Sequence, residues 1–275
     1  MTTRSMTTRS MTTRSMTTLV MAGHGARDER WSAVLADLAG RVRRLRPGHR
    51  VRLAFLELST PPLADVLAAT VGPVVVVPLL LAGGYHAHVD LPAIIAGVRP
   101  DARVAGPLGP HPLLTSVLAR RLAAAGLRPG DAVVLGAAGS ADPSALDDVR
   151  AAARLLSVRL SRPVTAAFAA GGTPTLADAL TRARTTRTAP RVAVASYLLA
   201  PGHFHGRLAD SSADLVSAPL GADDDLAALV WTRFDEAVEE AQLSRAPRAS
   251  SRSSLTMSPA LSSREGSEST PVNVS

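Results

Sequence analysis

Cysteine and lysine are both absent from this sequence of 275 residues, and aromatic residues make up only 3% of it. Without cysteine the chain has no disulfide bond, no thiolate zinc site and no iron–sulfur cluster held by its own ligands. Any metal ion must therefore be bound by histidine, carboxylate or water. Without lysine a Walker phosphate-binding loop is impossible, and neither a G-x-G-x-x-G fingerprint after the first apolar segment nor a G-x-S-x-G elbow occurs.

Long apolar runs are also missing. The run at residues 74–82 is among the longest, and it is well short of the ~20 residues that a membrane-spanning helix needs. The N-terminal region contains no apolar core of a secretory signal. We therefore expect a cytoplasmic protein that has no membrane partner.

Positive charge is concentrated at the two ends of the chain. The formal net charge is +7, of which residues 1–18 carry +3 and residues 244–275 carry +2. The rest of the chain is close to neutral, whereas a dedicated nucleic-acid binder presents a basic face, often with aromatic residues for stacking. We expect no nucleic-acid partner.

Both ends have the composition of disordered segments. Residues 1–15 are three copies of MTTRS, and Met16 begins an incomplete fourth copy directly before an apolar segment. We expect this repeat to be disordered and Met16 to be the true start. From residue 244 onward the chain is dense in serine, arginine, proline and threonine, which predicts a disordered tail over residues 244–275.

Between these ends, apolar segments alternate with amphipathic ones. This alternation is typical of β-α-β units with a parallel sheet, and strands that are apolar at nearly every position indicate helices on both faces. In the first half, the expected strands are residues 19–22, 51–55, 74–81 and 102–105, and the expected helices are residues 31–45, 62–69, 91–98 and 113–125.

The same order of segments occurs twice in the chain. Three blocks recur in the same order, and their offsets in sequence differ by only a few residues. Residues 24–28 match 138–142 at an offset of 114, residues 55–65 match 168–178 at 113, and residues 80–84 match 198–202 at 118. Such self-similarity predicts a duplicated domain. A turn near residues 127–130 gives expected domains at 16–128 and 129–243.

Polar residues follow the three main strands expected in the first half. His24 follows the first strand, Glu57 ends the second, and the segment GGYHAH at residues 83–88 follows the third. Because parallel strands end at one edge of a sheet, His24, Glu57 and His86 can share one cleft. Two imidazoles and a carboxylate suit divalent iron, cobalt or nickel.

The second half lacks these groups. Ala138, Ala170 and Phe204 stand where the first half has His24, Glu57 and His86. The fold therefore does not require the three polar side chains, and we expect only the N-terminal half to carry metal chemistry. We also expect Glu57 to lie at an apolar strand end, where burial of an unpaired carboxylate would cost free energy.

The remaining histidines are less informative. His88 can chelate a metal together with His86 or simply be exposed. His203 and His205, in the second-half loop, are expected to contact a ligand or to be structural rather than to bind metal. His49 and His111 adjoin glycine and proline at turns, so we expect both to be structural.

Taken together, these motifs resemble those of the sirohydrochlorin chelatases. They are HGARD at residues 24–28, AFLELSTP at 54–61, VPLLLAGGYH at 77–86 and YLLAPGHFH at 197–205. The resemblance covers about residues 17–240. It departs from the family pattern at Ala26, where serine is usual and a hydrogen bond is lost, and at Gly206, where an acidic residue is common.

The resemblance implies an α/β fold of two duplicated chelatase-like (Rossmann- or flavodoxin-like) halves with the active cleft between them. It implies a lyase that inserts Fe²⁺ or Co²⁺ into sirohydrochlorin without ATP, in siroheme or cobalamin (porphyrin-type) biosynthesis. The metal would be a substrate, with no permanently bound cofactor. His24 and His86 would bind the metal and accept pyrrole protons, with Glu57 assisting, and neutral imidazole suits both tasks.

Substrate contacts are expected from both halves. Sirohydrochlorin is rimmed with carboxylates, so Arg27 and Arg207, each just beyond a cleft loop, are candidates for binding them. The other expected contacts are Gly84, Tyr85, His203 and His205. We expect a monomer or a homodimer.

Two alternative functions stay open. A metal or tetrapyrrole carrier would use the same cleft without turnover. A ferrochelatase for another tetrapyrrole, such as coproporphyrin or protoporphyrin, would share the fold, although two short and closely similar halves fit the sirohydrochlorin branch better. The residues favour neither iron nor cobalt.

Overall fold

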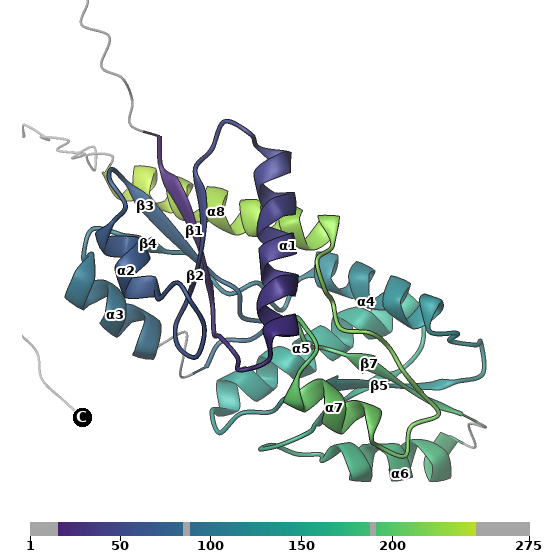
Figure 1. The fold of residues 1–275 in the computed structure, drawn as a ribbon. Coiled ribbons are helices and arrows are strands. Elements are labelled where there is room, and N and C mark those ends of the chain that lie inside the picture. Colours follow the sequence, from purple (N-terminus) through teal and green to yellow (C-terminus); the bar gives the residue numbers. More distant parts are fainter. Residues whose placement is uncertain (1–15, 85–88, 188–190, 246–275) are drawn as a thin grey trace, which may run out of the picture.

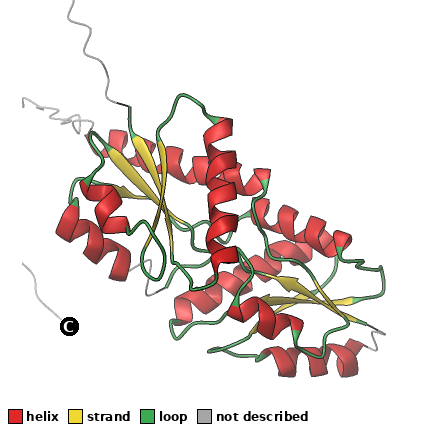
Figure 2. Ribbon diagram, viewed as in Figure 1, coloured by secondary structure: helices red, strands yellow, loops and turns green. Residues whose placement is uncertain are grey.

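Two parallel β-sheets, each flanked by helices, form the protein (Figures 1 and 2). The computed structural model describes residues 16–84, 89–187 and 191–245. The expected disordered ends, 1–15 and nearly all of 244–275, therefore lie outside the described residues. Among the helices that are described, none is long and apolar enough to cross a membrane.

Strands and helices alternate along both halves. The first half contains β1 (Thr18–Gly23), α1 (Glu29–Leu45), β2 (Val51–Phe55), α2 (Leu63–Ala68), β3 (Val74–Pro78), α3 (Leu91–Val98), β4 (Arg103–Val104) and α4 (Pro112–Ala124). The second half contains β5 (Ala132–Ala137), α5 (Pro143–Leu160), β6 (Val164–Phe168), α6 (Leu176–Arg187), β7 (Val192–Ser196), α7 (His203–Ala209), β8 (Leu215–Val216) and α8 (Asp224–Arg245).

The two sheets have the same topology, with strand orders β2-β1-β3-β4 and β6-β5-β7-β8. All pairings are parallel, and the registers correspond: Gly23 pairs with Phe55 in the first sheet, as Ala137 pairs with Phe168 in the second. The central strands β1 and β5 are buried at every position, as expected for sheets with helices on both faces. The predicted duplicated α/β fold is therefore confirmed.

Three element boundaries differ from the sequence prediction by two residues or more. β3 ends at Pro78 and not at residue 81, because the chain leaves the sheet there. Helix α1 begins two residues earlier than expected, at Glu29, since the Asp28 side chain caps it by accepting a hydrogen bond from the Arg30 amide. Helix α8 extends to Arg245, two residues into the expected tail.

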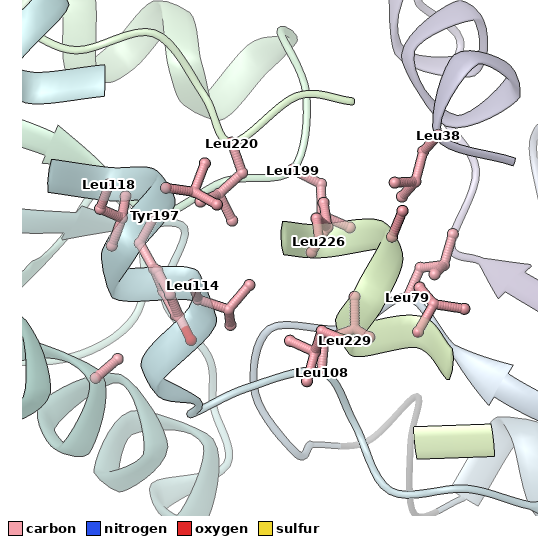
Figure 3. Packing of buried hydrophobic residues seen from close by; sticks show 14 of the residues in the cluster. Leu38, Leu79, Leu108, Leu114, Leu118, Tyr197, Leu199, Leu220, Leu226 and Leu229 are labelled. Carbon is pink, nitrogen blue, oxygen red and sulfur yellow. The ribbon is translucent and has the colours of Figure 1, made fainter. Parts of the chain in front are cut away.

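The last helix of each half packs on the other half. Helix α4 contacts α5 and β7 of the second half, and α8 contacts α1 and β3 of the first. In Figure 1, α8 crosses behind α1. In Figure 3, Leu114 of α4 lies beside Tyr197, and Leu229 of α8 lies near Leu79. Each such buried leucine contributes roughly 1.5–3 kcal/mol to stability. Because α4 and α8 each pack on the opposite half, the two sheets share one apolar cluster, and each sheet has a second cluster of its own. The division at residues 128/129 therefore separates the two sheets in sequence but does not separate the helices that pack on them.

Candidate functional site

A cavity of about 550 Å³ lies between the two halves. Its described walls come from the loops that follow β1, β3, β5 and β7, so it sits where parallel sheets of this kind usually bind ligands. The first half contributes His24, Trp31 and residues 79–84, and the second half contributes residues 137–142 together with apolar side chains of α5 and α7. Cavities of this size and mostly apolar lining accommodate small-molecule ligands.

His24 and Glu57 are brought together at the edge of this cavity. Nδ1 of His24 lies 3.3 Å from Oε1 of Glu57, and the two side chains are 37% and 52% exposed. The backbones meet as well, because the Glu57 amide donates a hydrogen bond of 3.0 Å to the His24 carbonyl. His24 lines the cavity, whereas Glu57 lies beside His24 and is not among the described lining residues.

The expected apolar surroundings of Glu57 are wrong. Strand β2 ends at Phe55, two residues before Glu57, which therefore lies in an exposed loop and not at a buried strand end. The cost of burying a carboxylate does not apply to this residue. The contact with His24 is the feature that distinguishes Glu57 from other exposed glutamates.

Gly25 makes this arrangement possible. Its φ angle is +103°, and a Cβ atom at this position would lie 1.7 Å from the Glu57 carbonyl oxygen. Only glycine permits both the positive φ and the close approach of the two loops. The same loop is held by Ser59, whose hydroxyl accepts a hydrogen bond from the Ala26 amide and donates one to the Ala26 carbonyl.

The expected second metal ligand, His86, belongs to the segment of residues 85–88. His86, Tyr85 and His88 lie outside the described residues. Among the residues that the structure does describe, no three histidine, aspartate or glutamate side chains gather closely enough to hold a metal ion. Gly84, which directly precedes Tyr85, lines the cavity as expected.

In the second half, apolar side chains occupy the corresponding positions. Ala138 and Phe204 line the same cavity as His24. The Ala170 amide donates a 2.8 Å hydrogen bond to the Ala138 carbonyl, just as Glu57 does to His24. The second half thus repeats the backbone of the site without its polar groups.

Four of the expected substrate contacts do not line this cavity. Arg27 and His203 are exposed, and Nε2 of His205 lies 3.4 Å from the Ser217 carbonyl oxygen. Arg207, on α7, instead lines a smaller cavity of about 310 Å³ beside Gly171 and Gly172. None of these four side chains is among the described residues that line the large cavity.

Comparison with known proteins places this geometry in a family. The model of the CbiX family matches residues 18–125 and 132–237, one match for each half. The chain belongs to the CbiX family. This confirms the resemblance to the sirohydrochlorin chelatases.

Solved structures share the fold of this CbiX-family chain. The structure of SirB from Bacillus subtilis with Fe³⁺ is 21% identical, with a TM-score of 0.69, over 82% of this chain and 97% of that one. SirB from Bacillus subtilis subspecies spizizenii, a sirohydrochlorin chelatase in complex with cobalt, is 22% identical over the same shares, with a TM-score of 0.66.

A third solved structure is CbiX, described as the terminal enzyme for biosynthesis of siroheme in denitrifying bacteria. It is 22% identical, with a TM-score of 0.60, over 80% of this chain and 99% of that one. No curated protein matches the sequence. At these identities the solved structures show that the CbiX-family chain has the chelatase fold.

Sequence reasoning missed several cavity residues of this CbiX-family chain. Trp31 lines the cavity from α1, and Tyr197 lines it from the end of β7. The Tyr197 side chain is buried, which raises the pKa of its hydroxyl, so Tyr197 stays protonated. The repeat offsets contained a signal for Tyr197, because at this position the first half has Leu79, a purely apolar residue.

Proposed function

We propose that this protein is a sirohydrochlorin chelatase, a lyase that inserts Fe²⁺ or Co²⁺ into sirohydrochlorin without ATP, in siroheme or cobalamin biosynthesis. The observation that carries the proposal is the His24–Glu57 pair at the edge of a large cavity with mostly apolar walls. Membership of the CbiX family supports it. So do the related structures, which were determined with Fe³⁺ and with cobalt.

His24 has the geometry of a metal-handling residue. Oε1 of Glu57 lies 3.3 Å from Nδ1 of His24, so Glu57 is the proposed acceptor for an Nδ1 proton when metal is bound, which would leave the lone pair of Nε2 for the cation. Carboxylates commonly orient metal-binding histidines in this way. Neutral imidazole also accepts protons near neutral pH, and metallation must remove two protons from the pyrrole nitrogens. His86 is proposed as the second ligand from its place in the sequence, and Glu57 as a partner of His24 or a third ligand.

The second half provides an apolar surface that suits the face of the macrocycle. Ala138, Leu146 and Phe204 line the cavity from this half, and such apolar side chains suit the face of a flat tetrapyrrole. None of these three offers a ligand to a metal. Asp142 of this half also lines the cavity, but its carboxylate caps α5 by accepting hydrogen bonds from Ser144, so the ion would reach the macrocycle from the side of His24. Gly84 lines the cavity, and Tyr85, His203 and His205 remain proposed contacts.

The rim carboxylates of the macrocycle are the proposed partners of the two arginines. Arg27 follows the His24 loop directly. Arg207 lies on α7, the helix that also carries Phe204, so a carboxylate side chain that extends past Phe204 would enter the smaller cavity. A guanidinium binds a carboxylate through two parallel hydrogen bonds.

The test is anaerobic incubation of the purified protein with sirohydrochlorin and either Fe²⁺ or Co²⁺, followed by absorbance. We expect many metallated products per chain, without ATP. A carrier would stop at one equivalent per chain. Insertion into coproporphyrin or protoporphyrin but not into sirohydrochlorin would contradict the proposed substrate and favour a ferrochelatase.

Glu57→Gln gives a sharper test of the site. Glutamine keeps the shape of the side chain and removes the charge that faces His24. We expect sirohydrochlorin binding to persist while metal affinity falls by about 10- to 100-fold, as for other partners of metal-binding histidines. Ala170→Glu is the matched control in the second half, and it should leave metal affinity unchanged. Equal metal affinity in Glu57→Gln and the unaltered protein would remove Glu57 from the site.

A further inference from the structure

Two hydrogen bonds join side chains of the second half to the backbone of the first-half segment 81–84. The Tyr197 hydroxyl donates to the Leu81 carbonyl at 2.9 Å, and the Gly83 amide donates to Oδ2 of Asp148 at 2.8 Å. All four residues of this segment line the large cavity. In the sequence, the segment directly precedes Tyr85 and His86. The second half therefore holds the cavity wall from which the proposed second metal ligand follows.

Both hydrogen bonds are partly buried. Gly83 is buried and Tyr197 is 2% exposed. The packing around the hydroxyl is tight, because a Cβ atom on Gly109 would lie 2.2 Å from the Tyr197 oxygen and 2.3 Å from the Leu81 oxygen. Glycine at position 109 thus leaves the space in which the two oxygens meet. A buried polar group that loses its partner is costly, so these contacts resist exchange with water.

The two anchoring residues are places where the halves differ. Helices α1 and α5 correspond at an offset of 114, which aligns Asp148 with Val34. Strands β3 and β7 correspond at 118, which aligns Tyr197 with Leu79. At both positions the first half has an apolar residue and the second half has a polar one. The half that lacks the metal ligands has polar groups directed at the loop of the half that carries them.

We propose that Asp148 and Tyr197 are positioning residues, which fix segment 81–84 and thereby the geometry of the metal site in the opposite half. The inference rests on the proposed function for the metal, but the fixing of the segment does not. Asp148 acts as a hydrogen-bond acceptor, and Tyr197 acts as a donor. On this basis the second half takes part in metal binding without supplying a ligand.

The first arm of the test follows hydrogen exchange in the full chain. Asp148→Ala and Tyr197→Phe should each speed exchange of the amides in segment 81–84 by about tenfold or more, because local opening no longer breaks that bond. Asp235→Ala is the matched control. Asp235 also joins the two halves, because its two carboxylate oxygens accept hydrogen bonds of 2.7 and 2.5 Å from the Arg46 guanidinium. Neither residue lines the large cavity. Unchanged protection of segment 81–84 in both test variants would overturn the proposal.

The second arm measures binding of Co²⁺ alone by its visible absorbance. Asp148→Ala and Tyr197→Phe should weaken Co²⁺ binding by about tenfold. Asp148→Asn keeps an acceptor oxygen and should restore both affinity and protection, while Asp235→Ala should bind Co²⁺ normally. Asp148→Asn behaving like Asp148→Ala would overturn the role of acceptor. If the unaltered protein binds neither Co²⁺ nor, anaerobically, Fe²⁺ although the exchange results hold, the proposed function fails and the anchoring of the segment stands.

Discussion

Gly25 in the first half and Gly139 in the second have φ angles of +103° and +102°. At each, a Cβ atom would collide with a carbonyl oxygen of the neighbouring loop, 1.7 Å away at Glu57 and 1.4 Å away at Ala170. In each half, the loop that contains the glycine is joined to its neighbour by an equivalent hydrogen bond, from the Glu57 amide to the His24 carbonyl and from the Ala170 amide to the Ala138 carbonyl. The equivalent helices α1 and α5 also begin with an aspartate cap, Asp28 and Asp142.

The side chains on this shared backbone are different. His24 and Glu57 face each other in the first half, and alanines occupy both positions in the second. Because the loop conformations depend on glycine and on backbone hydrogen bonds, the side chains could diverge without loss of the fold. The comparison separates what the fold requires, which is present twice, from what the proposed chemistry requires, which is present once.

The largest effect that this comparison predicts comes from His24→Ala. Removal of the imidazole should lower the rate of metal insertion by ~10²–10⁴-fold, the range typical of a lost proton acceptor, and by more if metal binding is also lost. His86→Ala should do the same. The fold should persist, since Ala138 occupies the equivalent place in the second half. Anaerobic turnover assays and circular dichroism measure the two effects.

The controls for this prediction lie in the second half. His203→Ala and His205→Ala should be milder and should affect binding of the macrocycle more than turnover, because neither side chain lines the large cavity among the described residues. The reverse ranking, with His203 or His205 essential and His24 dispensable, would mean that the metal binds to the other half.

The sequence predicted the fold more fully than the site. The alternation of apolar segments and the repeat offsets predicted both sheets, because burial on two faces leaves a strong pattern in composition. The exchange of α4 and α8 left no such pattern, since an amphipathic helix does not specify which sheet its apolar face covers. The prediction that Glu57 has apolar surroundings was wrong, because strand β2 ends at Phe55 and an exposed loop begins two residues before Glu57.

Contacts between the halves were also beyond the reach of sequence. Nothing local to Asp148 indicates that it accepts a hydrogen bond from Gly83, 65 residues away. Arg207 was expected at the mouth of the cleft because it follows a loop in the sequence. It lies on the short helix α7, whose direction places it at the smaller cavity instead. Placement of this kind depends on the orientation of whole elements, and a pattern within one element does not record it.

The second largest predicted effect separates loss of stability from loss of metal binding. Gly25→Ala and Gly139→Ala should each lower the free energy of unfolding by at least ~1–3 kcal/mol, because both force a side chain into a left-handed conformation and against a carbonyl oxygen. Chemical denaturation measures this loss. Only Gly25→Ala should also weaken metal binding, since it displaces the loops that carry His24 and Glu57. Equal loss of metal affinity in the two variants would show that both halves build the metal site.

The smallest effect concerns the two arginines. Arg27→Ala and Arg207→Ala should each raise KM a few-fold with little change in kcat, because an exposed ion pair contributes at most ~1 kcal/mol and a rim carboxylate is held equally in the ground and transition states. Raised salt should imitate both changes by screening the charges. Arg154→Ala, on the exposed surface of α5, is the control and should leave KM unchanged. A raised KM in Arg207→Ala alone would mean that the rim is held by the second half, beside its smaller cavity. A raised KM in Arg27→Ala alone would give the first half both the metal and the rim. If neither variant differs from Arg154→Ala, the macrocycle is held by its apolar face against the cavity wall.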